Sequence, residues 1–276
     1  MKRIFISLAF TLVFWNVENF FDWKADGTSS SETDFSSNGR KHWTYRRFTA
    51  KCNAVAKTVL AVSDSTGSVP DVVAFAEIEN ISVLRRLISY TALDKFDFKA
   101  ILFDSPDKRG IDCGVIYRSR RVKVVNACAK HIYDNNGKVM NTRDILLVET
   151  DSLDILVNHH PSKVGKGGDG NRSLAMMRMN TLCDSLERCG HSRIICVGDF
   201  NDDVWGGGDG TIKYNGRWEK IDGFFARGIK VRETVWKADY LTAADKKFGG
   251  VKPLRTYNGM KYLGGVSDHY PIVLTF

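Results

Sequence analysis

Carboxylate, amide and imidazole side chains gather where apolar segments of this sequence begin or end. Carboxylate and amide oxygens are ligands for Mg²⁺ or Mn²⁺ rather than for zinc. Histidines beside them can balance charge on phosphoryl oxygens. These residue types predict one shared site at a sheet edge for metal-assisted cleavage of a phosphate ester. The junctions are Asn16-Val17-Glu18-Asn19, Glu77, Asn158-His159-His160-Pro161, Gly198-Asp199-Phe200-Asn201 and Ser267-Asp268-His269.

The order of these five motifs resembles the endonuclease/exonuclease/phosphatase superfamily, and the resemblance covers residues 10–276. Arg109-Gly110-Ile111-Asp112 and the opening Asn-Val-Glu-Asn with Phe-Phe-Asp resemble a group of bacterial members without a settled substrate. The resemblance implies an α/β (α+β) fold, a four-layer α-β-β-α sandwich of two mixed sheets with outer helices. It also implies metal-dependent hydrolysis of a phosphoester by in-line attack of an activated water.

The resemblance assigns metal ligands by motif position. Glu77 is implied as the main ligand, and Asn16, Glu18 and Asp268 are implied as supporting ligands of the metal or of its water. The expected ion is Mg²⁺, with Mn²⁺ as a possible substitute.

The resemblance also assigns the catalytic residues. Asp199 is implied to orient or deprotonate the attacking water, and Asn201 to help it hold the phosphate and the water. His159 matches the position that contacts the phosphate, and His269 matches the second catalytic histidine. Asp222 is the expected orienting carboxylate for His269.

Some of these assignments have rivals in the sequence. His160 neighbours His159, and alternation along a strand sends the two side chains to opposite faces, so one of them is expected to be structural. Asp239 is the alternative to Asp222. The carboxylate that would orient His159 is left open among Asp104, Asp107 and Asp112.

Three basic residues are candidates for substrate binding. The glycine-rich segment Ser162–Asn171 is expected to form a rim loop that places Lys163 and Arg172 near a phosphate, or else a solvated loop. Arg109 is expected either to contact substrate or to pair with Asp112. Neither alternative is favoured by residue type alone.

Strand-like and helix-like segments alternate along the chain, as expected for a layered fold. Helical spacing occurs in Thr44–Val62, after a capping Asn80, and in Ser173–Cys189. Neither a linker-like change of composition nor an internal repeat divides the sequence, so residues 1–276 are expected to form one domain. The expected strands are Ile4–Val17, Asp71–Ala76, Phe98–Phe103, Cys113–Tyr117, Val122–Ala129, Asp144–Glu149, Asp154–Asn158, Arg193–Gly198 and Tyr270–Phe276.

Composition excludes several classes of protein. The chain has 276 residues and is 43% hydrophobic, which is too apolar for a disordered chain, and its 5 prolines exclude a collagen-like one. The 6 cysteines form no CxxC pair and are expected to be free thiols. The net charge of +8 favours a polyanionic partner such as nucleic acid.

These observations favour a phosphodiesterase, and most specifically a nuclease. The alternative is a phosphatase or phosphodiesterase acting on inositol phosphates or phospholipid head groups. A third and weaker hypothesis is an inactive binding scaffold. We expect a monomer without an obligate protein partner.

The apolar run from Ile4 to Trp15 follows Lys2 and Arg3 and resembles a short secretory signal. We interpret it as a first strand, because the small residues of a cleavage site fall in the middle of the run. The location, cytoplasmic or exported, stays open. The sequence contains no run of about 18 apolar residues, so a membrane span is not expected.

Overall fold

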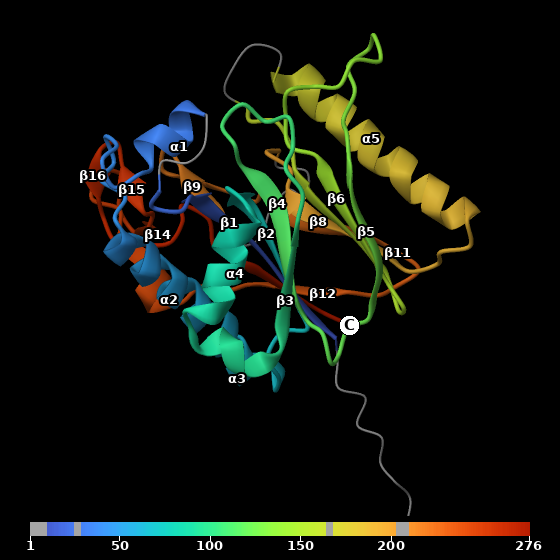
Figure 1. The fold of residues 1–276 in the computed structure, drawn as a ribbon, viewed down its shortest axis with the longest axis horizontal. Helices are drawn as coiled ribbons and strands as arrows, with labels where there is room; N and C mark the ends of the chain where they lie inside the picture. Colours follow the sequence, from blue (N-terminus) through green and yellow to red (C-terminus); the bar gives the residue numbers. More distant parts are fainter. Residues whose placement is uncertain (1–9, 25–28, 164–167, 203–209) are drawn as a thin grey trace, which may run out of the picture.

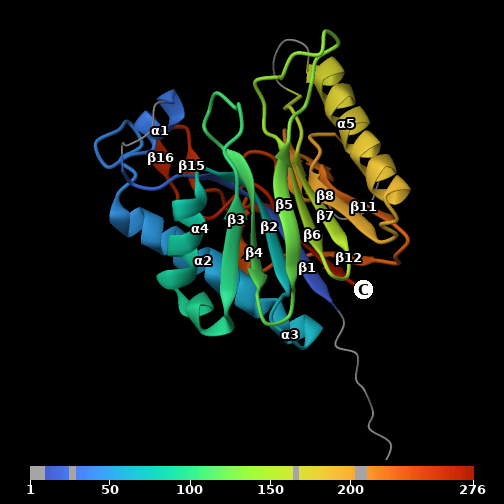
Figure 2. The same ribbon diagram turned by 45° about the vertical axis from the view of Figure 1, so that its right-hand side comes forward.

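Two large β-sheets pack face to face between helices in the computed structural model (Figure 1), which describes residues 10–24, 29–163, 168–202 and 210–276. Helices α2 (Tyr45–Ala61) and α4 (Ile81–Ser89) lie against the first sheet. Helix α5 (Gly168–Arg188) lies on the outer face of the second sheet, as the turned view also shows (Figure 2). The predicted four-layer sandwich is confirmed.

The first sheet has six strands in the order β12-β17-β1-β2-β4-β3. Strands β1 and β2 are parallel, whereas the other neighbours are antiparallel. A parallel pair needs a long crossover, and α2 lies in the segment that joins these two strands. The bounds are β1 (Thr11–Phe20), β2 (Val72–Ile78), β3 (Phe98–Leu102), β4 (Asp112–Arg118), β12 (Arg232–Val235) and β17 (Ile272–Thr275).

The second sheet has five strands in the order β11-β8-β7-β6-β5. Strands β7 and β8 are parallel, and α5 lies in the crossover between them. Strands β5 and β6 pair in antiparallel fashion. The bounds are β5 (Val124–Lys130), β6 (Ile145–Thr150), β7 (Asp154–His159), β8 (Ile194–Asp199) and β11 (Asp222–Arg227).

Three expectations about the elements need correction. Helix α5 begins at Gly168, so the expected loop Ser162–Asn171 includes its first turn. Strand β1 continues to Phe20, past the expected end at Val17, while residues 4–9 of that expected strand lie outside the described residues. Strands β11 and β12 were not expected, because Asp, Gly and Arg are uncommon in strands and obscure their pattern.

Shorter elements complete the described chain. One of them is a capped short helix that begins after Ser29, whose hydroxyl accepts from the Glu32 N–H. These elements are α1 (Ser30–Asp34), α3 (Ser63–Thr66), η1 (Ala92–Phe96), η2 (Asp239–Leu241) and the hairpins β9–β10 (Ile212–Tyr214, Arg217–Glu219), β13–β14 (Thr242–Ala244, Val251–Pro253) and β15–β16 (Tyr257–Asn258, Lys261–Tyr262).

Local sequence explains where the main helices begin. The Thr44 side chain accepts from the Arg47 N–H before α2, and Asn80 accepts from two N–H groups at the start of α4, as predicted. In the part of the chain that the structure describes, no helix combines the length and the apolar character needed to cross a bilayer.

Alternation along β1 builds two layers of core. Leu12 and Phe14 pack between the sheets, whereas Val13 and Trp15 pack under the helices of the first sheet.

We expect Phe14→Ala to lower the free energy of unfolding by about 3–5 kcal/mol, because it leaves a cavity between the sheets. Urea denaturation would measure this change. Val125→Ala is the control, since that side chain is 67% exposed; a comparable loss in both variants would contradict the expectation.

Candidate active site

The edge where β1, β2, β7 and β8 end carries a buried group of side chains from both sheets. We call Asn16, Glu77, His159, Asp199, Asp222 and His269 the acid–histidine cluster. Asp199 lies at its centre: its Oδ2 accepts from the Asn16 amide at 2.9 Å. The same oxygen is 3.7 Å from His159 Nε2 and 3.9 Å from His269 Nε2. The structure therefore brings motifs from positions 16 to 269 into one place.

Strained backbone directs Glu77 into this cluster. Its φ of 65° lies in the left-handed region, which is costly for a residue with a side chain. Its ladder to β4 is irregular between Phe75 and Ile78. Glu77 Oε2 accepts from the Asn19 N–H at 2.7 Å, and Oε1 lies 3.9 Å from His159 Nε2. The strain thus replaces regular pairing with a carboxylate aimed into the site.

Asp222 is the partner of His269. Its Oδ2 lies 2.8 Å from His269 Nδ1. Asp222 pairs in register with Asp199 across β11 and β8, which places both acids at the same end of the second sheet. Burial opposes a charged imidazole here, yet Asp222, Asp199 and Asp268 together raise the pKa of His269 well above its usual value. The three acids therefore favour the charged imidazolium form of His269.

His159 and His160 point to opposite faces of the second sheet. His159 belongs to the acid–histidine cluster, whereas His160 lies under α5, where its ring contacts Phe200. Burial, followed by the charges of Arg143 and Arg109, holds the pKa of His159 well below its usual value. The pKa values of the two histidines of the cluster are thus shifted in opposite directions.

No carboxylate orients His159 within the described part of the chain. Its buried Nδ1 has no hydrogen-bond partner there. Asp112 instead accepts from the Ser105 N–H at 2.9 Å, and Asp107 pairs with Arg143 at 3.1 Å. The expectation that Asp104, Asp107 or Asp112 would hold this ring is therefore corrected.

Asn201 adopts a left-handed backbone with φ of 51° directly after β8. Its N–H donates to Asp199 Oδ1 at 2.9 Å, and its side-chain amide donates to the His160 carbonyl at 2.9 Å. Burial and the nearby Asp222 raise the pKa of Asp199 to about 7, against these hydrogen bonds. Asn201 thus orients the central carboxylate and ties β8 to the end of β7.

The donor set suits a hard divalent cation. Glu77, Asp199 and Asp268 bring carboxylates to one place, with Asp268 Oδ1 3.8 Å from His269 Nε2. Atoms of Asp199, Asp222 and His269 lie within 4.8 Å of one another. Crowded buried carboxylates repel each other, and a bound cation would offset that repulsion.

Two expected metal ligands have other partners in this structure. Both Glu18 oxygens are engaged: Oε1 accepts from Arg255 at 2.7 Å and Oε2 from the Thr256 N–H at 2.8 Å. Asn16 Oδ1 accepts from the Glu18 N–H at 3.0 Å, while its NH₂ group faces the acids. Arg255 also lies 3.1 Å from Asp268. The arrangement makes Glu18 a structural partner of Arg255.

Arg109 lines a basic hollow beside the cluster, and it pairs weakly with Asp107 at 3.8 Å rather than with Asp112. Lys138 and Arg143 line the same hollow, which has a volume of about 710 Å³. Sequence reasoning missed Arg143, whose Nη2 donates to the His160 carbonyl at 2.6 Å. In the sequence, Arg143 stood out only as a charged residue just before the apolar run of β6.

The other two basic candidates are already paired. Lys163 contacts Glu219 Oε2 at 2.7 Å. Arg172 lies in the first turns of α5, where it pairs with Asp169 and approaches Asp202 at 4.0 Å. Neither residue lies in the acid–histidine cluster.

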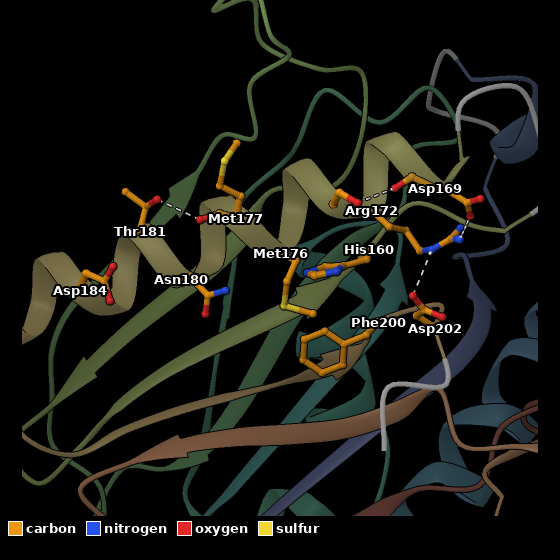
Figure 3. Close-up of a pocket in the computed structure, with 11 residues that line it drawn as sticks. His160, Asp169, Arg172, Met176, Met177, Asn180, Thr181, Asp184, Phe200 and Asp202 are labelled. Carbon is orange, nitrogen blue, oxygen red and sulfur yellow. Dashed lines mark hydrogen bonds and ion pairs between the residues drawn. The ribbon is translucent and has the colours of Figure 1, made fainter. Parts of the chain in front are cut away.

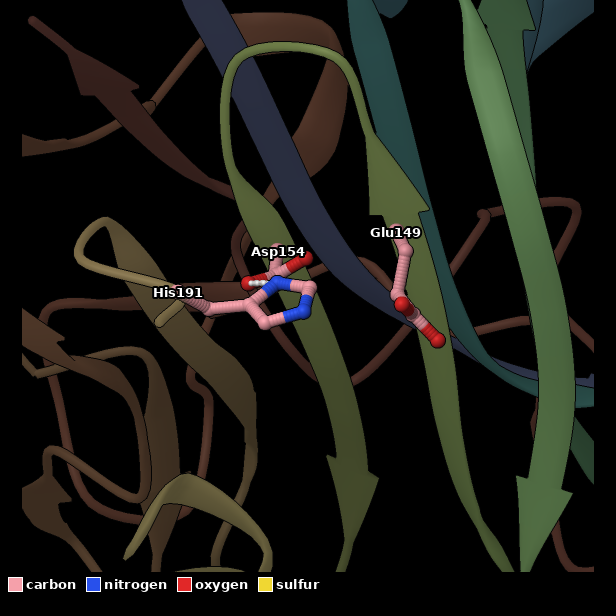
Figure 4. Close-up of side chains that lie close together, drawn as sticks. All are labelled: Glu149, Asp154 and His191. Atoms are coloured by element: carbon pink, nitrogen blue, oxygen red, sulfur yellow. Dashed lines mark hydrogen bonds and ion pairs between the residues drawn. The ribbon is translucent and has the colours of Figure 1, made fainter. Parts of the chain in front are cut away.

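A second group of metal-type ligands occupies the other end of β7 (Figure 4). Atoms of Glu149, Asp154 and His191 lie within 4.8 Å of one another. His191 Nδ1 is 2.8 Å from Asp154 Oδ2, and Glu149 accepts from the Asn126 amide at 2.8 Å. Asp154 and His191 thus pair with each other, and Glu149 is held by Asn126.

The sequence matches the model of the Endonuclease/Exonuclease/phosphatase family over residues 11–208 and 204–276. The chain belongs to this family. Its members are phosphoester hydrolases, so the expectation of a phosphoester-hydrolysing enzyme is confirmed. No curated protein matches the sequence.

Solved structures share the fold at low sequence identity. A TDP2 from D. rerio, humanized by 14 mutations, aligns with 98% of this chain and 99% of its own, at 16% identity and a TM-score of 0.58. The human Nocturnin catalytic domain with bound sulfate aligns over 97% of this chain and 93% of its own, at 14% identity and a TM-score of 0.57. A mannosyl-6-phosphatase from Bacteroides thetaiotaomicron aligns over 96% of this chain and 98% of its own, at 15% identity and a TM-score of 0.56. These likenesses show the fold.

Proposed function

We propose that this family member is a Mg²⁺-dependent phosphodiesterase that cleaves nucleic acid, with Mn²⁺ as an alternative ion. The observation that carries the proposal is the position of Asp199, buried between His159 and His269. A carboxylate between two imidazoles of different charge can handle the proton of an attacking water while the rings face phosphoryl oxygens.

Each side chain has a distinct task in this proposal. Asp199 takes or orients the proton of water, held by the Asn16 amide and the Asn201 N–H. His269, kept charged by Asp222, balances developing charge on the phosphoryl group.

Neutral His159 donates one N–H to the phosphate, while Asn201 helps to hold the phosphate and the water. Glu77 and Asp268 would hold the metal, and the Asn16 amide would position the Asp199 carboxylate beside it. The metal would neutralise the phosphate and the leaving oxygen.

A nucleic-acid substrate is supported by charge. The chain carries a net +8, and Arg109, Lys138 and Arg143 line the hollow next to His159. The backbone of a nucleic acid supplies a phosphate at each nucleotide. Basic side chains beside the cleavage site would therefore contact the phosphates that flank the cleaved one. A solved D. rerio TDP2 with a similar fold is complexed with a single-strand DNA product, and this likeness supports the choice of nucleic acid.

The runner-up is a phosphatase or phosphodiesterase on smaller phosphate esters, such as inositol phosphates or phospholipid head groups. The mannosyl-6-phosphatase among the similar structures favours keeping this class open. An inactive scaffold is disfavoured, because the cluster keeps an acid, an amide and two imidazoles in contact. We expect a single domain over residues 1–276 that acts as a monomer.

A metal-supplemented substrate screen tests the proposal. We expect cleavage of DNA or RNA in Mg²⁺, loss of cleavage in excess EDTA and recovery on adding Mg²⁺ or Mn²⁺, because the crowded carboxylates need a cation to bind an anionic substrate. The screen would follow oligonucleotide length by gel and phosphate release by colour assay. His269→Ala protein, purified by the same procedure, is the control for contaminating nuclease. Turnover of inositol phosphates or a phospholipid with no cleavage of nucleic acid would establish the runner-up.

A further inference from the structure

A hollow lies between α5 and the outer face of the second sheet, on the opposite side of β7 and β8 from the acid–histidine cluster. Its volume is about 650 Å³. Figure 3 shows His160, Met176 and Phe200 grouped in its middle, with Asp184 and Thr181 toward one end. Nothing in the proposed hydrolysis uses this space. We call it the α5 hollow.

Several polar atoms in the α5 hollow are buried and make no hydrogen bond within the described residues. His160 is only 1% exposed, and its Nε2 makes no hydrogen bond. Arg172 is 8% exposed, and its Nε and Nη1 make no hydrogen bond either, although Nε lies 4.0 Å from Asp202 Oδ2. Native proteins rarely leave buried polar atoms unsatisfied, so these atoms point to a ligand that completes them.

The charge of the α5 hollow excludes an anionic ligand. Asp169, Asp184 and Asp202 line it, against the single cation Arg172. Burial lowers the pKa of His160 to about 3, so the ring is neutral at physiological pH. A phosphate would meet three carboxylates here. The ligand is therefore neutral, or carries hydrogen-bond donors toward the acids.

The middle of the hollow favours a flat aromatic ring. The Met176 thioether and the Phe200 side chain line it, and thioethers pack well against aromatic rings. The exposed Asn180 amide and the His160 ring can each donate or accept at the edge of such a ring. A planar heterocycle with donors and acceptors on its edges, which is the chemistry of a nucleobase, matches this lining.

We propose that the α5 hollow binds the base of a nucleotide flanking the cleaved phosphodiester. This inference rests on the proposed function. The acid–histidine cluster and the α5 hollow are adjacent, because His159 of the cluster directly precedes His160 of the hollow. Asn201 also donates to the His160 carbonyl at 2.9 Å. Asp202, which lines the hollow, directly follows Asn201. A nucleic-acid strand crossing this edge keeps its phosphate in the cluster and its base under α5.

Methionine-methyl NMR tests base binding without catalysis. Adenosine and cytidine, which carry no phosphate, would be titrated into ¹³C-methyl-methionine-labelled protein, with ribose as the sugar control. We expect the Met176 signal, assigned with Met176→Leu, to shift saturably with a nucleoside and not with ribose. The Met179 signal should stay fixed, because that side chain is buried in the core under α5. Absence of a Met176 shift with any nucleoside would overturn the proposal.

Asn180→Ala should weaken nucleoside binding about fivefold to tenfold by removing one edge contact. Asn126→Ala, a change at the far end of the second sheet, is the matched control and should bind as the wild type does. Equal affinity in Asn180→Ala and wild type would count against the assigned contacts and overturn the proposal.

A kinetic comparison separates this inference from the proposed function. An oligonucleotide with one abasic position flanking the cleavage site should lose about tenfold in kcat/KM with wild-type protein, and less with Asn180→Ala. Cleavage of nucleic acid with no penalty at any flanking abasic position would reject the base site and keep the nuclease. A nucleoside-dependent Met176 shift in a protein that cleaves no nucleic acid would reject the nuclease and keep the base site.

Discussion

Asp199→Asn is expected to lower kcat by about 10²- to 10⁴-fold, with little change in stability. The carboxylate sits between two imidazoles and accepts from the Asn16 amide and the Asn201 N–H. An amide of the same shape keeps the packing, but it cannot take a proton from water. Steady-state kinetics on the substrate found in the metal screen would measure the loss.

The control for this prediction is Asp94→Asn, an exposed acid in η1 that does not belong to the acid–histidine cluster. Both variants should melt within a few degrees of the wild type, as followed by circular dichroism. A near-native rate in Asp199→Asn with intact folding would remove Asp199 from the centre of the mechanism. Loss of activity in Asp94→Asn would show that the assay reports folding instead.

His269→Ala is expected to reduce kcat by a similar factor of about 10²–10⁴, and Asp222→Asn to reduce it in the same direction. His269 Nδ1 and Asp222 Oδ2 are 2.8 Å apart, and in this proposal the acid acts on catalysis chiefly through the ring. The double variant should therefore be no slower than His269→Ala alone. Additive losses in a double-mutant cycle would mean that Asp222 has a separate task.

The same pair predicts a pH effect with a definite sign. Asp222 and the other nearby acids raise the pKa of His269 despite its burial, so the ring stays charged up to that raised pKa. If the imidazolium is the active form, kcat falls as the pH rises through the pKa of His269. Asp222→Asn removes the main stabilising charge, so the basic limb of the pH profile should move to lower pH. A basic limb at the same pH in wild type and Asp222→Asn would contradict this role for the pair.

Much of the site was predictable because its residues follow apolar strands directly. Parallel strands β1–β2 and β7–β8 bring their ends to one edge, so Glu77, His159 and Asp199 had to be neighbours once both sheets formed. The alternation of side chains on β7 also predicted that only one of His159 and His160 would face the cluster. Family motifs then placed Asp222 beside His269, which residue pattern alone left open against Asp239.

Other features depended on contacts between segments far apart in the sequence. Glu18 pairs with Arg255, 237 residues away, and no local pattern announces that partner. Arg143 reaches the His160 carbonyl only because the end of β7 and the start of β6 meet at one edge. The hollow under α5 arises from helix packing across β8. Strand periodicity thus determined which residue types reach the site, whereas side-chain partners, charge states and cavities followed from tertiary packing, because they depend on distances that sequence spacing does not encode.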